Sequence, residues 1–334
     1  MSSFKNILLI NFGGIGDEIL FLPVIRSVRQ MYLKSKITLC LEGRSRAFTQ
    51  LTDLIDNYFF VDIKTKNKYI EMLKLYFKAL FGRFDLVISS GFNPLISLLL
   101  FCTGIKTRIG YGSSSIAKRL LTHSVTLNKN QYASKMYYDL AKSISDIPFE
   151  LPAIKIDSEI QKETNSVLVH PGVSQISIRK NITKTVTAEL WAEIILKLLE
   201  RGKKVYLAGG SDDLECIQKI RNFLKDKDLT NFTDLFGQTK NIHDLAVLIK
   251  KSELLLCSDS APMHIGVAVN TKTAAIFGPT DDSVLLPDND NFLAVKNNAQ
   301  CRPCLWAKRQ TTCSELACLK FNADEIINKL EKFI

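Results

Sequence analysis

Polar side chains that could hold an anionic ligand stand between two apolar runs late in the chain. Glu253–Cys257 and Thr273–Phe277 each have the composition of a short buried strand, and Ser260–Val269 has the length of one helix. In such a βαβ unit, ligands lie beyond the carboxyl ends of the strands, where Asp259 and Ser260 stand. The first-turn N–H groups of the helix lack partners within it, so a diphosphate could satisfy them. Either Asp259 or Ser260 could cap this helix.

This segment also fits an ordinary crossover with a helix cap and a Gly-Pro turn. Three features favour a ligand site instead. Polar residues cluster at both strand ends, Pro262 lies in the first helical turn, and His264 lies one turn in on the ligand side.

A second candidate centre lies near the N-terminus. The apolar strand Asn6–Asn11 is followed by a Gly-rich turn, with Gly14 and Gly16, and then by a helical pattern that begins around Asp17. This order is typical of dinucleotide-binding domains, but Ile19 occupies the place of the third glycine. The alternative is that the glycines bring backbone close to a sugar, while Asp17 accepts a proton from a sugar hydroxyl. As a purely structural residue, Asp17 would be a first-turn acid favoured by the helix dipole.

These two segments resemble the signature of the heptosyltransferase-like glycosyltransferases of glycosyltransferase family 9, which includes the lipopolysaccharide core heptosyltransferases. The matching residues are D-S-A-P-M-H-I-G-V-A from Asp259, I-F-G-P-T-D from Ile276, and G-x-G-D from Gly14. Ala261 is a departure, because the family usually has glycine there. The resemblance implies that Asp17 is the catalytic base, with Glu18 ranked second.

Further matches assign the two substrates to different halves of the chain. R-I-G-Y from Arg108 resembles an acceptor-side segment, and H-P-G-V-S from His170 resembles a donor-side segment. Val186 stands where the family usually has Trp, which leaves open whether Lys184 or Lys180 contacts the donor diphosphate. The expected donor-binding residues are Lys184, Lys180, Ser174, Gly210, Asp259, Ser260, Ala261 and His264. The expected acceptor-binding residues are Gly14, Asn93, Arg108, Lys118 and Arg119, of which the last three could equally be ordinary surface charges.

Short strands alternate with helices along the whole chain, which predicts an α/β protein with parallel sheets. A stretch with Pro148 and Pro152 and no periodicity predicts a domain boundary, giving domains 1–157 and 158–334. The resemblance implies the GT-B architecture, with two doubly wound Rossmann-like domains facing a cleft. In that architecture the last helix, Ala323–Phe333, often crosses back to the first domain.

Positive charge is concentrated in the first domain. Residues 1–157 contain 21 Lys and Arg against 12 Asp and Glu, whereas residues 158–334 contain 23 against 22. This excess favours an anionic glycan or glycolipid acceptor and transient contact with the inner membrane surface, although a solvated basic surface would look the same. The basic residues are scattered and carry no nucleic-acid motif, so nucleic acid is not expected. The N-terminus does not resemble a signal peptide, which predicts a cytoplasmic protein.

Four of the eight cysteines lie late in the chain, at Cys301, Cys304, Cys313 and Cys318. Their spacing leaves a zinc site open, with free thiols or a loop clamp as the favoured interpretation. Independently of these cysteines, the family resemblance implies no cofactor and no metal in the chemistry. The predicted function is inverting, metal-independent transfer of a sugar, heptose-like and from an ADP-sugar, to an anionic saccharide in lipopolysaccharide or cell-surface glycan synthesis. The alternatives are a nucleotide-sugar epimerase of the same fold and a non-enzymatic nucleotide-binding module.

Overall fold

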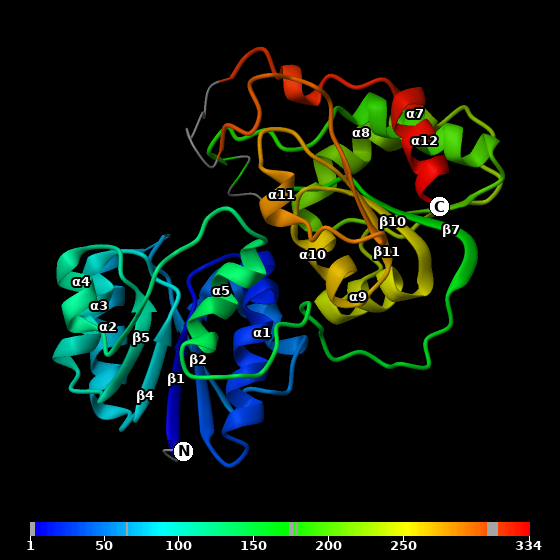
Figure 1. Cartoon of the computed structure of the whole chain (residues 1–334). Helices are drawn as coiled ribbons and strands as arrows, with labels where there is room; N and C mark the ends of the chain where they lie inside the picture. Colours follow the sequence, from blue (N-terminus) through cyan, green and yellow to red (C-terminus); the bar gives the residue numbers. More distant parts are fainter. Residues whose placement is uncertain (1–3, 65, 174–176, 178, 306–312) are drawn as a thin grey trace. The chain divides into compact units, whose positions relative to one another are not determined.

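A computed structural model describes residues 4–64, 66–173, 177, 179–305 and 313–334. The chain divides into two compact units, Met1–Lys155 and Ile156–Ile334, here called the first and second domains (Figure 1). Each domain contains one six-stranded sheet in which all neighbouring strands are parallel. The α/β fold class predicted from the sequence is confirmed.

The first sheet has the order β3-β2-β1-β4-β5-β6. Its strands are β1 (Asn6–Ile10), β2 (Lys36–Glu42), β3 (Asn57–Val61), β4 (Leu86–Ser89), β5 (Thr107–Tyr111) and β6 (His123–Val125). Its helices are α1 (Ile15–Met31), α2 (Lys68–Phe81), α3 (Pro94–Cys102), α4 (Ser115–Leu120) and α5 (Ala133–Lys142), with a 3₁₀ helix over Gly43–Gln50. Figure 1 shows α1 and α5 on one side of this sheet and α2, α3 and α4 on the other.

The second sheet has the order β12-β11-β10-β7-β8-β9, which repeats the first order when its strands are renumbered within the domain. Its strands are β7 (Glu163–His170), β8 (Lys204–Leu207), β9 (Phe232–Asp234), β10 (Ser252–Ser258), β11 (Lys272–Ile276) and β12 (Phe292–Val295). Its helices of four residues or more include α7 (Ala188–Glu200), α8 (Leu214–Leu224), α9 (Ile242–Lys251), α10 (Ala261–Ala268), α11 (Asp282–Leu285) and α12 (Ala323–Phe333).

Both sheets reverse their strand order at one point, between β1 and β4 in the first and between β7 and β10 in the second. Ligands of doubly wound domains bind outside the carboxyl ends of the strands at such a switch point. The turn leading to Asp17 follows β1, and the segment leading to Asp259 follows β10. Both predicted centres therefore lie at the switch points of their own domains.

The last helix, α12, belongs to the second domain. Its Ile326, Ile327 and Leu330 are buried in one hydrophobic cluster with Trp191 and Ile195 of α7. The apolar face of this helix is therefore used within the second domain. The expectation that the helix also reaches the first domain stays a prediction.

In the parts of the chain that the structure describes, the helices are all too short or too polar to cross a membrane.

Candidate active site

Asp17 lies in the first turn of α1 with both carboxylate oxygens engaged. Oδ2 accepts a hydrogen bond from the backbone N–H of Gly14 at 2.7 Å, which is the carboxylate half of a capping box. Oδ1 lies 3.4 Å from the hydroxyl of Tyr137 on α5, a residue that the sequence analysis did not identify. Burial, together with the charge of Asp17, raises the pKa of Tyr137, so this hydroxyl stays protonated and can donate. Asp17 thus has a fixed orientation and remains partly exposed.

The neighbouring acid, Glu18, has a different environment. Its side chain is fully buried, and burial raises its pKa well above the ordinary value, to which the charges of Asp17 and Glu42 add. A buried carboxyl group cannot reach a sugar hydroxyl, and burial disfavours the charged form that would accept its proton. The ranking of Asp17 above Glu18 therefore has a physical basis.

The glycine turn before Asp17 depends mainly on Gly13. A Cβ atom on Gly13 would lie 2.1 Å from Cβ of Asp17, which no side chain can tolerate. A Cβ atom on Gly14 would make only ordinary contact, 3.5 Å from Nη1 of Arg44. Ser45 holds the turn by donating to the carbonyl of Gly13 at 2.7 Å. The expectation that Gly14 contacts the acceptor remains a prediction, but the close packing in this turn occurs one residue earlier.

In the second domain, Lys184 and Asp259 form an ion pair. Lys184 Nζ lies 2.8 Å from Asp259 Oδ2, which also accepts a hydrogen bond from Thr280 Oγ1 at 2.6 Å. Burial would raise the pKa of Asp259, but Lys184, Thr280 and the nearby His264 hold that pKa below its ordinary value. The aspartate is therefore charged, and it fixes the ammonium group of a lysine whose side chain is still 19% exposed.

The loop carrying Lys184 is anchored through Thr185. The Thr185 hydroxyl donates to the carbonyl of Pro171 at 2.8 Å and accepts from Trp191 Nε1 at 3.0 Å. It also lies 2.8 Å from the hydroxyl of Ser258 at the end of β10. One hydroxyl thus connects the segment after β7, helix α7 and the end of β10, and it sets the starting point of the Lys184 side chain.

The N-terminus of α10 is not capped as the sequence suggested. Ser260 is the N-cap residue, but its side chain makes no capping hydrogen bond. Asp259 does not cap the helix either, because its carboxylate binds Lys184 and Thr280. Ala261 begins the helix, and His264 follows as a buried side chain close enough to influence Asp259.

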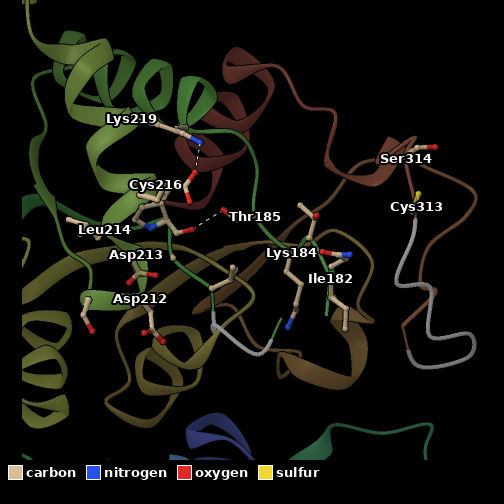
Figure 2. A pocket seen from close by; sticks show the side chains of 18 residues that line it. Ile182, Lys184, Thr185, Asp212, Asp213, Leu214, Cys216, Lys219, Cys313 and Ser314 are labelled. Carbon is tan, nitrogen blue, oxygen red and sulfur yellow. Dashed lines mark hydrogen bonds and ion pairs between the residues drawn. The ribbon is translucent and has the colours of Figure 1, made fainter. Parts of the chain in front are cut away.

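A cavity of about 860 Å³ lies beside this ion pair (Figure 2). Figure 2 shows Lys184, Thr185, Asp212 and Asp213 around it. Asp213 is buried, and its Oδ2 accepts from the N–H of Gly210 at 2.9 Å. Asp212 is exposed on the cavity wall, so of these two acids it is the one placed to meet a ligand.

The same cavity has a neutral histidine behind it. Nε2 of His170, at the end of β7, lies 3.9 Å from Asp213 Oδ2, and burial lowers the pKa of His170. A Cβ atom on Gly172 would lie 1.9 Å from Asp213 Oδ1, so the segment after β7 runs directly over this carboxylate.

Two further donor-side predictions are Lys180 and Ser174. Lys180 is exposed and is not among the residues that line it, whereas Lys184 lines it directly. Ser174 lies outside the residues that the structure describes.

The predicted acceptor residues other than Gly14 lie at three different places on the first domain. Asn93 caps α3 by accepting from the N–H of Leu95 at 2.9 Å, at the carboxyl end of β4. Lys118 and Arg119 are exposed on α4. Arg108 lies near the amino end of β5, at the opposite edge of the sheet from Asp17.

The guanidinium group of Arg108 is used within the domain. It donates to the backbone carbonyls of Leu120 and Ile105 and lies over the ring of Phe101, 5.3 Å from its centroid. These contacts give Arg108 a structural role, so the expectation that it binds the acceptor has no geometric support.

The four late cysteines lie together. Cys301, Cys304, Cys313 and Cys318 line a cavity of about 30 Å³, and all four are free thiols. Among the described residues, no three Cys, His, Asp or Glu side chains are arranged so that they could hold a metal ion. The zinc interpretation therefore gains no support from this arrangement.

Comparison with known proteins agrees with this geometry. The sequence profile of glycosyltransferase family 9 (heptosyltransferase) matches residues 73–315. The chain is 25% identical over 299 residues to lipopolysaccharide heptosyltransferase 3 of Escherichia coli K12, covering 83% of this chain and 84% of that protein. It is 24% identical over 327 residues to lipooligosaccharide heptosyltransferase 2 of Campylobacter jejuni, covering 95% and 96%.

A solved structure of the E. coli ADP-heptose lipopolysaccharide heptosyltransferase II superposes with a TM-score of 0.73 at 17% identity, covering 98% of each chain. The fold is that of the GT-B glycosyltransferases, with two Rossmann-like domains. Within this class the chain belongs to glycosyltransferase family 9, the heptosyltransferase family. It is therefore a glycosyltransferase, and neither the epimerase nor the non-enzymatic alternative is retained.

Proposed function

We propose that this protein transfers a heptose-like sugar from an ADP-sugar to an anionic saccharide or glycolipid acceptor during synthesis of lipopolysaccharide or a related cell-surface glycan. The names of its relatives support this substrate class, since all three proteins described above are heptosyltransferases of lipopolysaccharide or lipooligosaccharide. The donor binds the second domain and the acceptor binds the first. No nucleic acid takes part.

The observation that carries the proposal is the Lys184–Asp259 pair at the switch point of the second domain. Lys184 extends from a loop anchored by Thr185, and its partly exposed side chain lines the cavity. An ADP diphosphate would meet this ammonium group and the first-turn N–H groups of α10 together. Asp212 is placed to accept a hydrogen bond from a ribose hydroxyl.

In the proposed reaction Asp17 removes the proton of an acceptor hydroxyl as its oxygen bonds to the anomeric carbon of the donor sugar. The bond from that carbon to the diphosphate oxygen breaks on the opposite face, so the configuration inverts and ADP leaves. Lys184 and the N-terminus of α10 stabilise the negative charge that develops on the diphosphate. These groups supply the positive charge that a divalent cation would otherwise provide, so the proposed chemistry needs no metal.

The proposed location is the cytoplasm, with transient contact at the inner face of the membrane. All eight cysteines are free thiols, which is the usual state in a reducing compartment. The basic excess of residues 1–157 would attract an anionic acceptor and the membrane that carries it.

Transfer assays with ADP-heptose and a lipid-free core saccharide test this proposal. We expect release of ADP and an inverted glycosidic linkage, detected by mass spectrometry and NMR, with undiminished rates in EDTA. Rates that vanish in EDTA and return with Mg²⁺ would overturn metal independence. Conversion of the donor without transfer would overturn the proposed reaction itself.

A matched pair of variants tests the donor site. Lys184→Met should raise the donor KM by about tenfold or more, because it removes a charged contact to the diphosphate. Lys180→Met, on the same segment but outside the cavity lining, should change the donor KM by less than about twofold. The reverse ranking would assign the diphosphate contact to Lys180.

A further inference from the structure

Helix α2 is apolar on the side facing away from the sheet as well as on the side facing it. Leu75 and Ala79 face the sheet and are buried in the core of the first domain. Leu73, Phe77 and Phe81 follow one another at four-residue spacing on the other side and are 55%, 50% and 74% exposed. The rings of Phe77 and Phe81 stack on each other, with centroids 6.1 Å apart.

Helix α3 repeats this arrangement beside it. Ile96 and Leu100 are buried, whereas Leu95, Leu98 and Phe101 are exposed. Figure 1 shows α2, α3 and α4 next to one another on this side of the sheet. The exposed apolar residues of these three helices form what we call the outer face: Tyr69, Ile70, Leu73, Phe77, Phe81, Leu95, Leu98, Phe101 and Ile116.

Such a surface is unusual on a helix that packs against a sheet. The side away from the core normally carries polar residues, and a helix that is apolar all round is normally surrounded by apolar material. Contiguous exposed apolar surface of this kind marks a contact with another molecule or with a membrane.

The charges around the outer face identify the kind of partner. Residues 68–119 contain eight Lys and Arg and two acids, Glu71 and Asp85. Glu71 is bonded to Lys74 and to the N–H of Asp62, and Asp85 accepts from the N–H groups of Lys5 and Asn6. Lys68, Lys74 and Lys78 are exposed on α2 itself. The outer face is therefore an apolar surface surrounded by Lys and Arg side chains.

We propose that the outer face docks on an anionic phospholipid bilayer. Apolar side chains on one side of a helix can enter the boundary between headgroups and acyl chains, while neighbouring lysines meet lipid phosphates. A second copy of the chain fits less well, because a two-fold contact through this face would place like charges against each other.

The position of the outer face also suits the proposed function. Only this part of the inference rests on that function. Helices α2 and α3 both begin at the carboxyl edge of the first sheet, as does α1 with Asp17. A bilayer lying along α2 and α3 would therefore present a lipid-anchored acceptor at the edge of the sheet where Asp17 stands.

Vesicle flotation of the full-length protein tests the proposal. Wild type should float with phosphatidylcholine vesicles that contain phosphatidylglycerol and should float poorly with pure phosphatidylcholine. The triple variant Leu73→Ser, Phe77→Ser and Phe81→Ser should lower the bound fraction by about tenfold or more, since it removes the stripe on α2. The charge variant Lys68→Glu with Lys78→Glu should weaken binding to the anionic vesicles and make the remaining binding less sensitive to salt, because less charge attraction is left to screen.

A matched control removes exposed apolar residues elsewhere, with Leu33→Ser and Phe223→Ser, and should float like wild type. The kcat with a saturating lipid-free acceptor should stay within about twofold of wild type in every variant, which separates this inference from the proposed function. Wild type that fails to float, or a triple variant that floats like wild type, would overturn the proposal. Light scattering that shows a dimer for wild type and a monomer for the triple variant would also overturn the proposal. In that case the outer face would be covered by a second copy of the chain.

Discussion

The carboxylate of Asp17 is oriented by a backbone N–H on one side and a tyrosine hydroxyl on the other. Asp17→Asn keeps an oxygen for the Gly14 N–H but cannot take up the proton of an acceptor hydroxyl. We expect the transfer rate to fall by about 10²–10⁴-fold while the donor KM stays near wild type. Steady-state kinetics with both substrates check this. A rate within a few-fold of wild type would remove Asp17 from the proton transfer.

Glu18 gives a pH dependence of stability with a definite sign. The folded protein holds the Glu18 proton more tightly than the unfolded chain does, because burial raises the pKa above the ordinary value of 4.5. The free energy of unfolding contributed by this group therefore falls as pH rises above about 4.5 towards the pKa in the folded protein.

Glu18→Gln removes this titration. The variant should be more stable than wild type at about pH 8, by roughly 1 kcal/mol or more, and the difference should shrink towards about pH 5. Urea unfolding at the two pH values measures it, with the exposed Glu159→Gln as control. If the free energies of unfolding of variant and wild type differ by the same amount at both pH values, the raised pKa of buried Glu18 is contradicted.

At the scale of elements, the single hydroxyl of Thr185 joins three segments of the second domain. Thr185→Val should destabilise the protein by about 1–3 kcal/mol, because Trp191 Nε1 is left without its acceptor. It should also raise the donor KM several-fold, since Lys184 is the adjacent residue.

A variant with similar stability loss separates these two effects. Thr187 caps α7 by accepting from the N–H of Leu190, so Thr187→Ala should cost about 1 kcal/mol without moving Lys184. Chemical unfolding and donor kinetics on both variants check this. An equal rise of the donor KM in Thr187→Ala would mean that general loosening, not the position of Lys184, is responsible.

The sequence predicted most elements because their patterns are local. The βαβ unit around Asp259 was found within one or two residues, since apolar runs and an N-cap position mark its boundaries. The partners of the site residues were missed. Tyr137 lies 120 residues from Asp17, and Thr280 lies 21 residues from Asp259, so only the fold brings them together.

Two motif-based assignments show the same limit of local patterns. Arg108 matches a family motif, but its position in β5 places it at the amino edge of the sheet, which a motif does not reveal. The glycine motif pointed to Gly14, whereas close packing against Asp17 occurs at Gly13. Contacts of this kind depend on which side chains the fold brings together. The spacing of residues along the sequence does not reveal this.

At the scale of the molecule, the basic excess of residues 1–157 implies a salt dependence that differs between the two substrates. We expect the acceptor KM to rise steeply between low and moderate salt, because charge attraction is screened beyond a Debye length of about 8 Å at physiological ionic strength. The donor KM should rise less, since Lys184 acts at short range and is partly buried. Kinetics across a salt series, with a neutral osmolyte as control, check this. Equal salt dependence for both substrates would mean that the basic excess is only solvated surface charge and does not attract the acceptor.

Each sheet is covered by its own helices and encloses its own apolar cluster, as the separate clusters of the two domains show. We therefore expect each domain to unfold as its own cooperative unit, so that heating or denaturant shifts two equilibria. A single melting temperature is then not a well-defined property of this protein. If ADP binds the second domain as proposed, it should stabilise that domain by mass action and leave the first to unfold at its own midpoint.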